Sequence, residues 1–295
     1  MPPPRLSAAR RAPYLFLAPY LVLLLFFGVV PTGFAVWVSL LKPDLSFAGL
    51  ANWQSVLSDY RLPPAIANVG NYLGLWLPVM LLLVTSLSLL AHQRGGRVSA
   101  VGRFSWYLPG AVTGAAAALL WLFMLSPGIS PYSPLLELFG IDSGSELLGG
   151  SGLAVVLTIM ATMVTAGGWI VVVYAALETV PQEVLEAARV DGASGRQIAL
   201  HVKLPHIRPQ LTLMLISSFA YGTQIFVEPQ VLRTAFPSQV GATWSVNQLA
   251  YYFATQGGDF GKAAALSLML LSAGLLVAVA VITRTDLYAT DAKRA

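Results

Sequence analysis

The residues of this chain that could do chemistry are few, and their spacing does not form a catalytic or metal-binding set. The sequence has no cysteine, which excludes disulfides, thiol nucleophiles and cysteine-based metal sites. Its three histidines are His92, His201 and His206, and no carboxylate is placed near the last two to complete three or four ligands. We interpret all three as solvated loop histidines and predict no metal site.

Motifs of enzymes are also missing. Residues 257–263 resemble a phosphate-binding loop, but they lack its spacing and have alanine where serine or threonine should follow the lysine. The chain contains no Gly-x-Ser-x-Gly motif, no His-Glu-x-x-His motif and no paired intramembrane aspartates. The sequence therefore predicts no catalytic residue and no enzyme activity in this chain.

One charged segment, 178–208, lies between two apolar runs and has helical periodicity. Thr179 and Gln182 are spaced as a capping box, which predicts a helix that begins beside them. Apolar Val184, Leu185 and Ala188 would then form one stripe along that helix. The segment therefore begins with a short amphipathic helix.

A sharp turn and a second helix are predicted to follow. Gly192 can adopt the left-handed conformation that ends a helix. Ser194 and Gln197 form a second capping box, and Pro205 is expected to end the second helix. The same pattern is typical of a DNA-binding helix-turn-helix, so the segment alone does not decide its own function.

Composition places this segment in a membrane protein, since 56% of residues are hydrophobic and 10% charged, and the mean hydropathy is +0.71. A helix needs about 20 apolar residues to cross the bilayer core. Segment 126–150 is predicted to be a loop, and 234–258 is too polar for a span. Charge-free runs predict six transmembrane helices, at 14–40, 71–91, 105–125, 153–177, 210–232 and 263–283.

The basic residues predict the orientation of these spans. Thirteen of the 17 lysines and arginines fall on one side, which should be cytoplasmic, together with both termini and the 178–208 segment. The net charge of +4 therefore reflects membrane topology and gives little reason to expect nucleic acid. The four on the other side are Lys42, Arg61, Arg233 and Lys262.

Several motifs then resemble one family. Glu186-Ala-Ala, Asp191-Gly-Ala and Leu204-Pro resemble the EAA loop of permease subunits of binding-protein-dependent carbohydrate ABC importers. The motifs beginning at Tyr14, Phe47 and Gly261 are similar to the same family, although Arg196 and Ala199 stand where it often has aromatic residues. This resemblance implies that the charged segment couples to an ATPase subunit through these residues: Glu183, Glu186, Ala187, Ala188, Asp191, Gly192, Ala193, Arg196, Leu204 and Pro205.

The resemblance also implies an architecture and partners. The fold class is an all-α integral membrane protein with six spans, the type I ABC importer permease fold. A cytoplasmic tail, 1–13, would precede the permease domain, 14–283, and a second tail, 284–295, would follow it. The implied partners are a second EAA-type permease, two ATP-binding subunits, an external solute-binding protein and the lipid bilayer, without nucleic acid. ATP and Mg²⁺ would be used by the partner subunit, at the bacterial plasma (inner) membrane.

A path for the solute is predicted from polar residues within two spans. Tyr221, Gln224 and Glu228 would share one face of a helix, and a carboxylate within a span usually faces a cavity or a partner. The alternative is that Glu228 already reaches the outer interface, with Pro229 ending the helix there. Threonines in spans more often bond their own backbone or join helices than bind solute. The fourth span adds Thr158, Thr162, Thr165 and Trp169.

The predicted function is import of a sugar or oligosaccharide from an external binding protein into the cytoplasm, driven by ATP. The same kind of permease for a glycerol phosphate ester or a polyol remains an alternative. An ion-coupled secondary transporter should show inverted repeats and midplane carboxylates, which the chain lacks. A membrane-anchored DNA-binding regulator should carry net positive charge on the loop, where acidic residues instead balance the basic ones.

Overall fold

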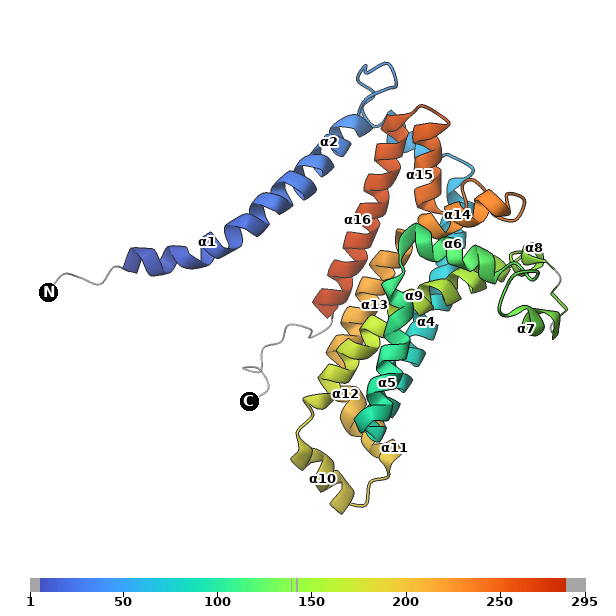
Figure 1. The fold of residues 1–295 in the computed structure, drawn as a ribbon. Coiled ribbons are helices and arrows are strands. Elements are labelled where there is room, and N and C mark those ends of the chain that lie inside the picture. Colours follow the sequence, from blue (N-terminus) through green and yellow to red (C-terminus); the bar gives the residue numbers. More distant parts are fainter. Residues whose placement is uncertain (1–5, 139, 142, 285–295) are drawn as a thin grey trace. The chain divides into compact units, whose positions relative to one another are not determined.

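The computed structural model describes residues 6–138, 140–141 and 143–284, and these are helical except for loops and one isolated antiparallel bridge between Leu41 and Phe47 (Figure 1). The chain divides into two compact units, which are described separately. The first comprises Met1–Asp59 with Ala250–Met269, and the second comprises Tyr60–Leu249 with Leu270–Ala295.

The first unit begins with one long apolar helical run. It consists of α1 (Leu6–Leu24), a π-helical turn η1 (Leu25–Val29) and α2 (Val30–Ser39). Pro31 lies in the first turn of α2, directly after the wide π turn, where its missing N–H group breaks no helical hydrogen bond. Helix α1 thus begins inside the segment predicted as a tail, while 1–5 and 285–295 of the two predicted tails lie outside the described residues.

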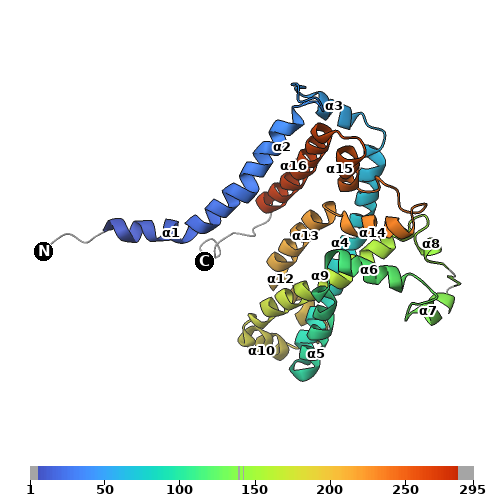
Figure 2. The same cartoon turned by 45° about the horizontal axis from the view of Figure 1, so that its top comes forward.

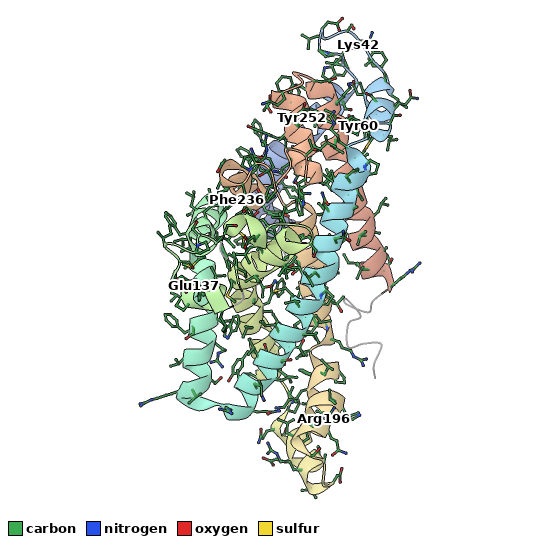
Figure 3. All side chains as sticks on the ribbon, turned by 90° about the vertical axis from the view of Figure 1, so that its right-hand side faces the viewer. Lys42, Tyr60, Glu137, Arg196, Phe236 and Tyr252 are labelled. Atoms are coloured by element: carbon green, nitrogen blue, oxygen red, sulfur yellow. The ribbon has the colours of Figure 1, made fainter. Side chains whose placement is uncertain are left out.

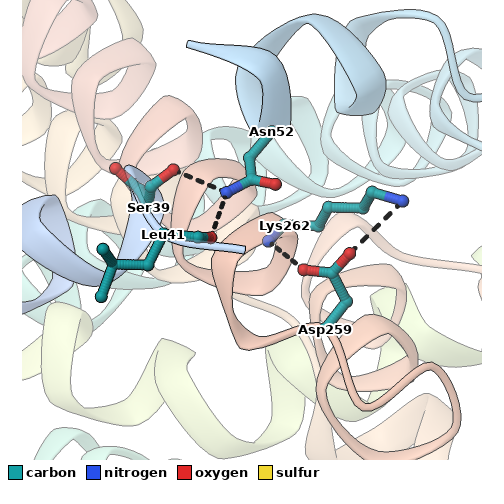
Figure 4. A network of polar contacts seen from close by, with 5 residues as sticks. All are labelled: Ser39, Leu41, Asn52, Asp259 and Lys262. Atoms are coloured by element: carbon teal, nitrogen blue, oxygen red, sulfur yellow. Dashed lines mark hydrogen bonds and ion pairs between the residues drawn. The ribbon is translucent and has the colours of Figure 1, made fainter. Parts of the chain in front are cut away.

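A buried amide holds the rest of the first unit together. Asn52, in α3 (Ala51–Leu57), donates from Nδ2 to the carbonyl oxygens of Ser39 at 2.8 Å and Leu41 at 2.7 Å (Figure 4). Asp259 accepts a hydrogen bond from the backbone N–H of Lys262 at 3.0 Å, at the start of α16 (Phe260–Arg284). Segment 257–263 therefore caps a helix.

The second unit is built on two long helices. Helix α4 (Leu62–Arg94) packs along α9 (Gly152–Glu178), and its buried Val69, Tyr72, Trp76 and Met80 recur every three or four residues. This period places them on one face. Helix α5 (Gly96–Tyr107) follows α4 through Gly95, at φ +57°, and packs against α9 as well.

The predicted third span, 105–125, is wrong as a continuous helix. Helix α5 runs on into the 3₁₀ turn η2 (Leu108–Ala111), and α6 (Gly114–Met124) then leaves at 102°. Pro109 lacks an N–H group and Gly114 has φ +61°, so the backbone cannot continue the helix here. Hydropathy does not detect such a break because both halves are apolar.

The predicted fifth span, 210–232, is also broken. Helix α13 (Arg208–Thr223) and α14 (Val227–Ala235) meet at 43°. The predicted loop 126–150 contains two short helices, α7 (Ser133–Leu138) and α8 (Gly144–Leu147), and 234–258 contains α15 (Val246–Thr255).

The all-α membrane class is confirmed. Among the described residues, four helices are long and apolar enough to cross a membrane, and up to six spans result if each bent pair counts as one.

Candidate coupling loop and polar path

The first helix of the 178–208 segment is present, but its predicted capping box is wrong. Helix α10 (Gln182–Val190) begins after Pro181, and no side chain caps it. Thr179 is instead the C-cap of α9, so its hydroxyl donates to the carbonyl of Ala176 at 2.8 Å and lies 2.9 Å from His206 Nε2. Because α9 extends to Glu178, Thr179 is occupied in ending one helix and cannot start the next.

The turn after α10 has the predicted geometry. Gly192 has φ +79°, in the left-handed region. Ala193 N donates to Ala188 O at 2.9 Å, closing the six-residue hydrogen bond of a Schellman end. The chain therefore reverses at Gly192 through a conformation that disfavours a side chain.

The second capping box is confirmed. Ser194 N donates to Gln197 Oε1 at 2.7 Å, and Gln197 N donates to Ser194 Oγ at 3.3 Å. These reciprocal bonds start α11 (Gly195–Ile198).

The expectation that this helical run ends within about a residue of Pro205 is confirmed, since the run ends at His206 with Ile207 as its C-cap. The run continues through a π turn, η3 (Ala199–Lys203), and α12 (Leu204–His206) before α13 begins at Arg208. Pro205 lies in the first turn of α12, directly after the wide turn, so its missing N–H breaks no α-helical bond.

A small apolar core joins the two arms of the loop. Val180, Leu185 and Ile198 are buried together, with Ala188, Ala193 and Val202 partly buried against them. Leu185 is only 4% exposed, so its side chain belongs to this core. Val184 and Val190 are large apolar side chains that α10 leaves exposed.

The charged residues of the loop remain accessible, with the exception of Lys203. Among the predicted coupling residues, Leu204 and Pro205 lie half-buried at the base of the loop. Figure 3 shows Arg196 at one end of the second unit, on the loop that contains α10 and α11. The exposed members of the set are Glu183, Glu186, Ala187, Asp191, Gly192 and Arg196, whereas Ala188 and Ala193 are half-buried.

A buried lysine connects the loop to α4, which sequence reasoning missed. Lys203 is 7% exposed, and its Nζ lies 2.8 Å from His92 Nδ1. Burial, together with Arg189, lowers the pKa of Lys203 below its usual value. His92 is half-buried, so its interpretation as a solvated histidine is wrong, whereas His201 and His206 are exposed as expected. Within the described residues, no three His, Asp or Glu side chains gather to hold a metal ion.

The predicted face of Tyr221, Gln224 and Glu228 does not exist as a helical face. Helix α13 ends at Thr223, Gln224 is its C-cap, and Glu228 lies in the first turn of α14. Carbonyls freed by the break find side-chain donors, since Asn247 Nδ2 donates to Gln224 O at 2.8 Å and Ser245 Oγ donates to Ile225 O at 2.9 Å. These bonds replace the helical ones at the bend.

The threonines of α9 divide into two kinds. Thr165 donates to its own backbone, at Ala161 O over 2.6 Å. The hydroxyls of Thr158 and Thr162 are buried and have no hydrogen-bond partner among the described residues. Trp169 is half-buried.

An aromatic group that the sequence analysis missed lies between α4 and α13. The rings of Tyr72 and Trp76 stack at 5.5 Å and 10°, and Trp76 lies 6.1 Å from Tyr221. Tyr72 Oη and Trp76 Nε1 are buried and find no partner in the described part of the chain. Their spacing of four along α4 was a visible signal. The second unit therefore contains unsatisfied polar atoms beside aromatic rings.

No protein-family profile matches the chain, but relatives are found by sequence. The sn-glycerol-3-phosphate transport system permease protein UgpA of Escherichia coli O6:K15:H31 (strain 536 / UPEC) is 28% identical over 271 residues, covering 89% of this chain and 90% of that protein. The alpha-glucoside transport system permease protein AglF of Rhizobium meliloti (strain 1021) is 28% identical over 269 residues, covering 88% and 78%.

The fold matches a crystal structure of a bacterial ABC transporter involved in the import of the acidic polysaccharide alginate, with a TM-score of 0.79 at 19% identity, over 93% of this chain and 95% of that chain. A structure of a bacterial alginate transporter in complex with alginate pentasaccharide-bound periplasmic protein matches equally well, at 0.79 and 19%, over 94% and 96%. The resemblance to carbohydrate ABC importer permeases is therefore confirmed.

Proposed function

We propose that this chain is the membrane-spanning subunit of an ATP-driven importer, and that loop 178–208 transmits the movement of a separate ATPase subunit to the spans. The observation that carries this proposal is the construction of the loop. It is a small folded module with its own core, exposed acidic and basic side chains, and a helix on each side of the Gly192 turn. A rigid module can transmit a push that a flexible loop would absorb.

The loop is attached to the spans at more than one place. Lys203 contacts His92 of α4, and Thr179 at the end of α9 contacts His206. Force on α10 would therefore reach α4 and α9 as well as α13. ATP and Mg²⁺ would be used by the partner, and a second permease subunit and an external binding protein would complete the importer. The periplasmic protein in the alginate importer complex supports the last of these partners.

The chemistry of the candidate path favours a neutral sugar. The predicted path residues supply hydroxyl, amide and aromatic groups, which bind sugars by hydrogen bonds and ring stacking, and Glu228 would repel an anion. They are Thr162, Thr165, Trp169, Tyr221, Gln224 and Glu228. Glycerol 3-phosphate is the second candidate, because UgpA proteins are among the relatives. A phosphate ester would require a cation that these six residues do not provide.

The test compares two glycines of the loop. Gly192 needs a positive φ, whereas Gly195 has an ordinary helical backbone, and each has open space where a side chain would lie. Gly192→Val strains the turn by about 1–3 kcal/mol, which is too little to unfold a protein of this size but enough to misplace the module. We expect Gly192→Val to insert into the membrane yet lose solute uptake and the ATPase stimulation caused by loaded binding protein.

Gly195→Val should retain both activities. Uptake is measured in cells with radiolabelled α-glucosides and, separately, with glycerol 3-phosphate, which distinguishes the two solute classes. Normal coupling in Gly192→Val would remove the sharp turn from the mechanism.

A further inference from the structure

A groove lies where α4, α5 and α9 meet, apart from the coupling loop and from the candidate path. Its volume is about 250 Å³. Its walls are apolar side chains, chiefly Leu87, Leu90, Val98 and Ile170. Gly102 of α5 also lines it and has open space where a side chain would lie. A groove of this kind fits a hydrocarbon chain.

Two guanidinium groups stand among these apolar walls. Arg94 is the last residue of α4, and Arg103 lies on α5. Among the described residues, none that lines the groove carries a carboxylate. The groove is therefore amphipathic, with positive charge beside an apolar surface, and its ligand should combine a negative group with an apolar tail.

Arg103 is held in place before any ligand arrives. Its Nη1 donates to Ser99 Oγ at 2.7 Å, and its guanidinium carbon lies 3.6 Å from the centre of the Tyr174 ring. Stacking on the ring uses the face of the guanidinium and leaves N–H groups at its edge for an anion. Less side-chain entropy is then lost when an anion binds.

The position of the groove matches a membrane surface. The turn between α4 and α5 lies at the same end of the second unit as α10 and α11 (Figures 1 and 2), the end that the distribution of basic residues predicts to be cytoplasmic. Trp106 also lines the groove, and indole rings favour the interfacial region of a membrane. Basic pockets between spanning helices on the cytoplasmic side bind anionic lipid headgroups.

We propose that this groove binds one phospholipid with an anionic headgroup from the inner leaflet, phosphate on Arg94 and Arg103 and one acyl chain along Gly102. The site rests on the membrane orientation used for the proposed function, but not on which solute is carried. A free phosphate would use the arginines and leave the apolar walls uncovered, so the lipid accounts for more of the groove.

The experiment measures lipid retained by the full-length chain, in the complex in which it is expressed, by native mass spectrometry after delipidation. Dioleoyl phosphatidylglycerol, dioleoyl phosphatidylcholine and inorganic phosphate are titrated separately. We expect the phosphatidylglycerol affinity to exceed that of phosphatidylcholine. It should fall roughly twenty-five-fold in Arg94→Gln/Arg103→Gln, from about fivefold per arginine.

Two further variants make the result specific. Arg97→Gln changes a neighbouring exposed arginine that does not line the groove, and should leave binding unchanged. Gly102→Leu fills the groove and keeps both arginines, so it should weaken lipid binding. It tests the site independently if the arginine double variant folds poorly. Equal affinity for the two lipids, displacement of phosphatidylglycerol by inorganic phosphate, or full binding in Gly102→Leu would overturn the proposal. Normal solute uptake and coupling in Gly192→Val would count against the proposed role of the loop but would leave this lipid site standing.

Discussion

The amide of Asn52 occupies the space that any side chain on Gly261 would need. A Cβ atom built on Gly261 meets the Asn52 amide nitrogen and the Leu41 carbonyl oxygen, and lies 3.1 Å from Asn52 Cγ. Asn52 is in turn committed to the carbonyls of Ser39 and Leu41. Two of the motifs that carry the family resemblance, beginning at Phe47 and at Gly261, thus meet in one close contact.

This contact predicts that Gly261→Ala is destabilising. The added methyl must displace a buried amide or a backbone carbonyl, and overpacking of this kind costs about 1–3 kcal/mol. The thermal midpoint of the detergent-solubilised protein should fall. Gly274→Ala is the matched control on the same helix, since nothing lies within 4 Å of its added carbon. A midpoint that falls equally in both variants would indicate a helix effect instead of this contact.

Two adjacent glycines of α9, Gly167 and Gly168, test the packing of α5 against α9. A Cβ on Gly167 meets the Trp106 carbonyl oxygen and lies 2.5 Å from Tyr107 Cα, whereas a Cβ on Gly168 meets nothing. Small residues allow spanning helices to approach this closely. Gly167→Ala should therefore reduce the amount of folded protein recovered from membranes, by at least severalfold, and Gly168→Ala should not. Similar recovery of both would contradict the close approach.

Gln224 is the sharpest test of the solute path. Its side-chain Oε1 accepts from Asn247 at 3.2 Å, while its backbone carbonyl separately accepts from the same amide at 2.8 Å. Gln224→Leu keeps the backbone bond and removes only the polar side chain, so the bend should survive. A lost hydrogen bond to solute is worth about 1–2 kcal/mol, and uptake at limiting solute should fall severalfold or more. Unchanged uptake kinetics would remove Gln224 from the path, and Glu228→Gln should have the smaller effect.

Membrane orientation is tested by labelling in the cysteine-free background. Gln182→Cys, on α10, and Tyr132→Cys, in the 126–150 segment, are both exposed and should react with an impermeant thiol reagent from opposite sides. Labelling of position 182 from outside intact cells would invert the topology.

The features that could be predicted from the sequence are those with local causes. Gly192 and the Ser194–Gln197 box were predictable because a left-handed turn and a capping box are formed by residues within a few positions of each other. The capping box predicted at Thr179 was wrong because its cause is not local. Whether a residue ends one helix or begins the next depends on how far the preceding helix extends.

The broken spans could not be found by hydropathy, which counts apolar residues without asking where the backbone hydrogen bonds go. The bend after Thr223 is stabilised by hydrogen bonds from Ser245 and Asn247, about twenty residues further on. The sequence around the bend contains no signal that predicts these bonds. The His92–Lys203 contact joins residues 111 positions apart, so it required the fold.

The π turn before Pro205 limits how the sequence of the loop can evolve. Leu204 N bonds to Ala199 O, five residues back, and this extra residue makes room for the prolyl ring one position later. Deleting one residue from Ala199–Lys203 would restore an ordinary turn and drive the ring into the preceding carbonyl, while also rotating all that precedes it by about 100°. Replacing Pro205 first would remove that clash. The order in which two mutations arise would then decide whether the lineage passes through a damaged permease.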